Sequence, residues 1–170
     1  FFFYWWIMII ENVISSCYSL LRNVTPLNFD CGKICHGKCC KGDNKTGMVL
    51  FPGEEKILDK DINVITDDEG FKIAVCDGAC NRNYRPLSCR IYPLFPVIKN
   101  ENGREYIQVE IDPRADCPLC SEEYQFTKEF IKSVKRVGKY LLLNEETADT
   151  YRKLSAEIED INKLRELLFK

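Results

Sequence analysis

Apolar residues recur at helical spacing near both ends of the chain. Over residues 7–22 they fall three or four positions apart, which predicts an amphipathic helix, and Pro26 then ends the helical region. Over residues 122–143 an apolar stripe lies opposite a row of lysines, which predicts a second helix. Asn144 is a suitable N-cap for a third helix, whose apolar repeat is interrupted at Arg165. We expect the last two helices to form an antiparallel hairpin that packs on the rest of the protein.

The middle of the chain shows the alternation of short β-strands. Residues 62–65 and 71–76 predict one β-hairpin across the turn DDEG, and residues 94–99 and 105–111 predict another across NENG. Between the hairpins lies CDGACNRNYRPLSCRIYPLFP, which carries three cysteines and three prolines and predicts an irregular connector.

These elements predict an α+β fold. We expect a small, metal-organised, cysteine-rich domain with short β-hairpins over residues 29–120. An N-terminal helix over residues 1–28 and the helical hairpin over residues 121–170 flank it. Residues 31–47 contain almost no aliphatic side chain, so something other than apolar packing must order that segment.

Composition narrows the function classes. Apolar residues make up 45% and charged residues 29% of the 170, as in folded globular proteins. The net charge of −2 offers no basic field, so we expect neither nucleic acid nor a membrane as partner.

The apolar start FFFYWWIMII lacks the flanks of a signal peptide and is far shorter than the roughly 20 residues of a membrane-spanning helix. One hypothesis is that residues 1–7, upstream of Met8, are not native.

Ten cysteines are far more than an average chain of this length carries. Disulfides in an oxidising compartment and thiolate–metal bonds in a reducing one are the two explanations. Nine of the ten are clustered, and two ligands separated by two or three residues can reach one ion, at about 2.3 Å for a zinc–sulfur bond. The clustering favours a cytoplasmic metal-binding protein over an extracellular disulfide scaffold, which we keep as a third hypothesis. The predicted metal ligands are Cys31, Cys35, Cys39, Cys40, Cys76, Cys80, Cys89, Cys117 and Cys120.

The remaining residue types limit the chemistry. His36 is the only histidine, so no site here has the two or three imidazoles of most catalytic zinc hydrolases, although His36 itself stays a candidate ligand. Cys17 falls on the apolar stripe of the first helix, which predicts a buried, inert thiol. Adjacent Cys39 and Cys40 point to different sides of the backbone, so we expect only one of them at the metal that Cys31 binds. The CPLC pair at residues 117–120 is also typical of redox-active dithiols, but its surroundings lack a βαβ unit and we favour ligation.

The basic residues near the cysteines can offset thiolate charge. A four-thiolate zinc site carries a formal charge of −2, and neighbouring cations favour the thiolate form. The basic residues in such positions are Lys33, Lys38, Lys41, Arg85 and Arg90.

The run CGKICHGKCC, followed by a cysteine pair and then by YRPLSCRIYP, resembles the YkgJ-type cysteine-cluster family, described as zinc- or iron-chelating domains. The resemblance covers residues 29–120 and implies metal binding without implying a reaction. The first spacing departs from the family pattern by one residue, as does the interval from Cys80 to Cys89. The sequence CCKG at residues 39–42 is also similar to the cysteine-cluster region of flagellin lysine N-methylases. The positions that match the YkgJ-type motif are Cys80, Tyr84, Arg85, Pro86, Cys89, Arg90, Tyr92 and Pro93, and then Asp116, Cys117 and Pro118.

Besides the disulfide scaffold, two function classes remain. In the first, a noncatalytic or accessory protein, for which a protein partner is possible, holds one zinc ion or iron–sulfur cluster, and the remaining cysteines supply a second site or its surroundings. In the alternative, the protein is an iron–sulfur-dependent enzyme, such as a protein-lysine N-methyltransferase or a redox protein. In both, metal holds residues 29–120 together, so chelation is expected to unfold this segment before the helices melt. The ligands of the first site are predicted to be Cys31, Cys35, Cys39 and Cys89.

Overall fold

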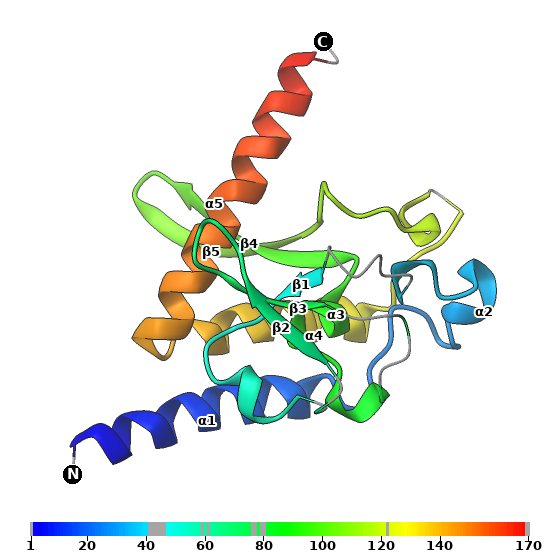
Figure 1. Ribbon diagram of the computed structural model, residues 1–170. Helices are drawn as coiled ribbons and strands as arrows, with labels where there is room; N and C mark the ends of the chain where they lie inside the picture. Colours follow the sequence, from blue (N-terminus) through cyan, green and yellow to red (C-terminus); the bar gives the residue numbers. More distant parts are fainter. Residues whose placement is uncertain are drawn as a thin grey trace.

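The computed structural model describes residues 2–40, 47–58, 60, 62–75, 78, 81–121 and 123–168, and for residues 2–9, 40 and 82 it describes the backbone alone. The protein is a mixed α+β structure with small antiparallel sheets, which confirms the predicted fold class at that level. Figure 1 shows α1 along one edge, the strands in the centre and α5 extending away from the body towards the C-terminus. The longer helices are α1 (Phe2–Leu20), α4 (Lys128–Leu141) and α5 (Glu145–Leu168).

Both predicted hairpins are present. Strands β2 (Asn63–Thr66) and β3 (Lys72–Val75) pair antiparallel, and so do the longer strands β4 (Leu94–Glu101) and β5 (Arg104–Ile111). A strand that the sequence did not predict, β1 (Gly47–Val49), pairs with the free edge of β3 and gives a three-stranded sheet in the order β1-β3-β2.

The terminal helices agree with the predictions in kind and differ in their ends. Helix α1 begins at Phe2, five residues before the predicted start. Helix α4 begins only at Lys128, because the hydroxyl of Thr127 accepts a hydrogen bond from the Phe130 amide and caps the helix there. Asn144 caps α5 as predicted. None of the described helices has the length and apolar character needed to cross a bilayer.

One apolar core joins all three predicted segments. It includes Ile14 from α1, Val97 from β4, Val134 from α4 and Ile158 from α5. Helix α4 packs against both α1 and the β4–β5 hairpin. Helix α5 is fixed on β4, where the Tyr151 hydroxyl donates a hydrogen bond of 2.5 Å to a backbone carbonyl. Leu87 and Ile91 join the short helix that carries Cys89 to this core.

Candidate metal centre

A cavity of about 220 Å³ lies where three cysteine-bearing segments meet. The first segment contains α2 (Gly32–Cys35) and the 3-10 helix η1 (Lys38–Cys40), the second is helix α3 (Leu87–Ile91), and the third ends in the 3-10 helix η4 (Pro118–Cys120). Figure 1 shows α2 and the loop after β5 on the same side of the molecule, away from the termini. The cysteines that line this cavity are Cys31, Cys35, Cys39, Cys89 and Cys117.

The other predicted ligands have different positions. Cys120 lies beside Cys117 and shares a side-chain hydrogen bond with it. Cys76 and Cys80 lie outside the described residues, as does the side chain of Cys40. His36 is exposed in the turn after α2 and does not line the cavity.

The first segment is ordered by its own backbone. Asp30 accepts a hydrogen bond from the Gly32 amide, and α2 then makes a single turn. His36 and Gly37 adopt left-handed φ angles of 52° and 66° and form the turn between Cys35 and Cys39. No described side chain between residues 31 and 40 is buried, so apolar packing contributes little here.

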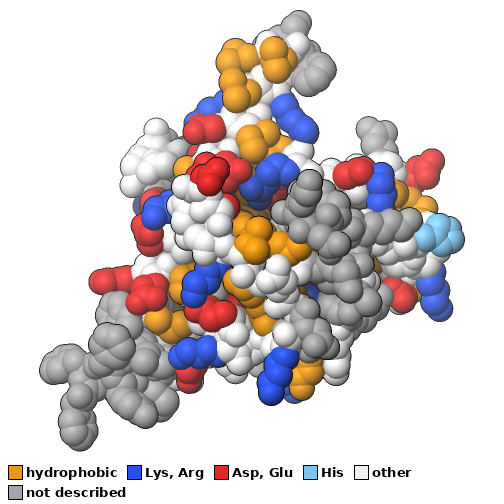
Figure 2. Space-filling view, in the orientation of Figure 1, with side chains coloured by type: hydrophobic (Ala, Val, Ile, Leu, Met, Phe, Trp, Pro, Cys, Tyr) orange, Lys and Arg blue, Asp and Glu red, His pale blue; other side chains and the backbone are white. Residues whose placement is uncertain are grey.

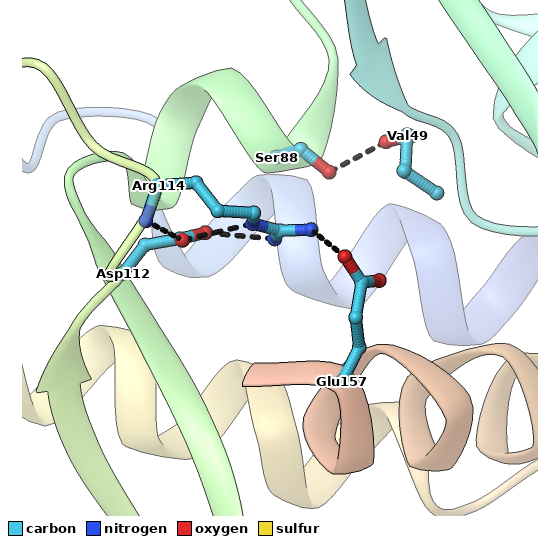
Figure 3. A network of polar contacts seen from close by, with 5 residues as sticks. All are labelled: Val49, Ser88, Asp112, Arg114 and Glu157. Atoms are coloured by element: carbon cyan, nitrogen blue, oxygen red, sulfur yellow. Dashed lines mark hydrogen bonds and ion pairs between the residues drawn. The ribbon is translucent and has the colours of Figure 1, made fainter. Parts of the chain in front are cut away.

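The second segment is held by the body of the protein. Leu87 and Ile91 are buried on one side of α3, which leaves Cys89 half-buried beside the cavity. The Ser88 hydroxyl donates a hydrogen bond of 2.5 Å to the Val49 carbonyl and thereby ties α3 to β1 (Figure 3).

The third segment is anchored by an arginine. Figure 3 shows the Arg114 guanidinium between two carboxylates, those of Asp112 and Glu157. It donates two hydrogen bonds to Asp112, of 3.0 and 2.8 Å, and one of 3.0 Å to Glu157 on α5. Such a two-point contact fixes geometry better than a single ion pair. The loop that leads to Cys117 therefore starts from a defined position on the body.

The first and third segments also contact each other directly. The Lys38 ammonium lies 2.7 Å from a carboxylate oxygen of Asp116. Both side chains are exposed, so this ion pair adds little stability. It does show that the two cysteine-bearing segments, far apart in the sequence, are in contact at the cavity.

Arginines outnumber the carboxylates at the cavity, which is lined by Arg22, Arg85 and Arg90 and by Asp30 and Asp116. Arg85 and Arg90 both line it, and Arg90 donates hydrogen bonds of 2.9 and 2.8 Å to the carbonyls of Arg85 and Asn83. Burial, followed by the repulsion of Arg85, lowers the pKa of Arg90, which nevertheless stays charged at neutral pH. This arrangement suits a site that concentrates thiolate charge.

Burial disfavours the charged thiolate form of the cysteines and so raises their pKa values. It raises the pKa of Cys117, and it raises the pKa of Cys120 to about 11, with the neighbouring Cys117 adding to the effect. Without a metal these two thiols are therefore protonated at neutral pH. A bound cation would reverse this effect, because metal binding displaces thiol protons.

The donor set fits a soft metal. Thiolates select zinc and iron–sulfur clusters, and five cysteine side chains line this cavity without a histidine. Among the side chains that the structure describes, no three of Cys, His, Asp and Glu already stand in coordinating geometry. Ligation would therefore require the thiols to move towards one another within the cavity.

No protein-family model, curated protein or solved structure matches this chain.

Sequence analysis missed the residues that hold the cysteine-bearing segments in place around the cavity. Sequence analysis singled out none of Asp112, Arg114 and Glu54. In the structure Glu54 is completely buried. In the sequence, Glu54 follows the apolar run MVLF after Pro52 and Gly53, where a solvated turn and a buried polar residue look alike.

Proposed function

We propose that this protein is a cysteine-cluster protein that holds zinc or an iron–sulfur cluster through thiolates. The observation that supports this most is the meeting of five cysteines from three distant segments at one cavity. Four of them, Cys31, Cys35, Cys39 and Cys89, are the proposed ligands of the first site, and Cys117 is a fifth candidate. The metal would crosslink the three segments, as structural zinc does in small domains.

The proposal includes membership of the YkgJ-type family and a reducing, cytoplasmic location, in which thiols stay free to bind metal. Cys17, Cys35, Cys117 and Cys120 are free thiols. On the face that Figure 2 shows, the described Lys and Arg side chains are interspersed with Asp and Glu. The proposal keeps the expectation that nucleic acid is not a partner.

The test is the metal and acid-labile sulfide content of the full chain purified without oxygen. Metal in stoichiometric amount supports the proposal. Zinc without sulfide identifies a structural or chelating site, whereas iron with matching sulfide and a visible charge-transfer band identifies a cluster. A chain that holds neither metal, and takes up neither after reduction and reconstitution, contradicts the proposal.

Paired cysteine variants locate the site. Cys89→Ser removes a sulfur at the cavity and is expected to lower metal content and to speed metal release. Cys17→Ala is the matched control, because Cys17 is fully buried in the core and does not line the cavity. Equal loss of metal in both variants would place the metal elsewhere.

A further inference from the structure

Glu54 is a charged residue with no exposed surface, in the short 3-10 helix η2 (Glu54–Lys56). Its carboxylate accepts three hydrogen bonds: from the Phe51 amide at 2.7 Å, from the Tyr18 hydroxyl at 2.7 Å and from the Leu87 amide at 2.6 Å. A buried carboxylate is unfavourable unless such donors surround it. The next residue, Glu55, is a contrast, because it makes a partly exposed ion pair with Lys72.

The hydrogen bond to the Leu87 amide supplies an N-terminal cap that α3 otherwise lacks. The first amides of any helix have no partner within the helix and are usually capped by the side chain that precedes it. In α3 that position is Pro86, whose side chain makes no capping hydrogen bond. Glu54 therefore caps α3 from a distant part of the chain.

The bond to Tyr18 extends the same connection towards the cavity. The Tyr18 ring lies beneath the Arg90 guanidinium, whose central carbon is 4.4 Å from the ring centre. Arg90 and Cys89 are neighbours on α3 and both line the cavity. One carboxylate thus contacts the start of the helix that carries Cys89 and also the aromatic ring on which Arg90 rests.

We propose that Glu54 is a positioning residue of the cysteine cavity, which holds α3 in the place and orientation that direct Cys89 and Arg90 towards the other thiols. The structural part of this inference stands on the three hydrogen bonds. Its consequence, that loss of the carboxylate weakens metal retention, rests on the proposed function.

Glu54→Gln tests the inference. Glutamine is nearly the same size, but one of its two terminal groups is an NH₂ donor, which in this site must face an N–H or O–H donor. Glu55→Gln is the matched control. The measurement is the alkylation rate of each cysteine in reduced, metal-free protein under native conditions, resolved by peptide mass spectrometry.

The expected result is a several-fold rise in Cys89 alkylation in Glu54→Gln, with the rate of Cys117 unchanged and with Glu55→Gln like the wild type. An unchanged ratio of Cys89 to Cys117 alkylation overturns the inference. A rise that Cys17 and Cys117 share also overturns it, because it shows general unfolding. Should Glu54→Gln fail to fold, Tyr18→Phe removes one donor with little change in shape, and the same ratio decides the outcome.

A second measurement separates this inference from the proposed function. With Co²⁺ as the probe, Glu54→Gln is expected to show altered thiolate charge-transfer absorption and faster release to a chelator than Glu55→Gln. If the wild type binds no metal under any condition, the proposed function fails, and the alkylation ratio still decides whether Glu54 positions α3.

Discussion

The guanidinium of Arg90 lies 4.4 Å from the centre of the Tyr18 ring, so the helix that carries Cys89 contacts the N-terminal helix through a cation–π interaction. Arg90 also uses its planar group to donate hydrogen bonds to the carbonyls of Asn83 and Arg85. These contacts require the planar shape as well as the charge. Lysine at this position would keep only the charge.

Arg90→Lys is therefore expected to lower the free energy of unfolding by about 1–2 kcal/mol, through the lost hydrogen bonds and ring contact. Arg152→Lys is the matched control. Arg152 makes a two-point contact with Glu105 on the surface, where such a pair contributes only about 0–1 kcal/mol. Urea unfolding of both variants measures the difference. Equal effects would mean that the Arg90 contacts contribute no more to the free energy of unfolding than a surface ion pair does.

The pH dependence of stability contains a contribution from Glu54. Burial raises the pKa of this carboxyl from 4.5 to about 7, despite three hydrogen bonds that favour the ionised form. The unfolded chain releases the proton near pH 4.5, whereas the folded protein keeps it until about pH 7. The stabilisation from this group is therefore complete below pH 4.5 and is lost as the pH rises through 7.

We expect this loss to amount to about 3 kcal/mol at most. Glu54→Gln cannot titrate, so the difference in unfolding free energy between wild type and variant should shrink in magnitude as the pH rises from 4.5 to 7. Urea unfolding of reduced, metal-free protein across that range measures it. A difference that is constant with pH would show that Glu54 ionises as it does in the unfolded chain.

Cys17 should be the least reactive of the described cysteines. It is fully buried, and burial together with the nearby Glu54 carboxylate raises its thiol pKa to about 12. Because the thiolate is the nucleophile, native protein at pH 8 should alkylate at the cavity cysteines long before Cys17. Denaturant should abolish the contrast. Early labelling of Cys17 in folded protein would mean that the core opens readily.

Removal of metal should loosen the cysteine segments and leave the core intact. Sequence alone predicted that all of residues 29–120 depend on metal, but Phe51, Leu87 and Val97 belong to the same core as the terminal helices. We expect faster amide hydrogen exchange near residues 31–40 and 113–120 after chelation, with little change in β4 and α4. Unfolding of β4 upon chelation would restore the original prediction.

The longer helices and strands could be predicted from sequence because each is long enough to show the repeat of its apolar residues. The β4–β5 hairpin and the capped helix after Asn144 are of this kind. Strand β1 has three residues and α3 has five, too few to show any period. The four cysteines predicted for the first site, Cys31, Cys35, Cys39 and Cys89, do line one cavity. The place of Cys117 beside them depends on tertiary packing, which cysteine spacing does not encode. Glu54 was missed for the same reason, since its partners come from α1 and α3.

The ion pair between Lys38 and Asp116 has a consequence for how the chain matures. The segments it joins are far apart in sequence, and contacts of that kind form late because a long loop must close first. During synthesis the early cysteines emerge well before their partner segment and stay open to oxidants until the rest of the chain follows. Low thiol reactivity at the cavity is therefore expected only after the later segment has been synthesised and has folded. A truncated chain should keep reactive thiols.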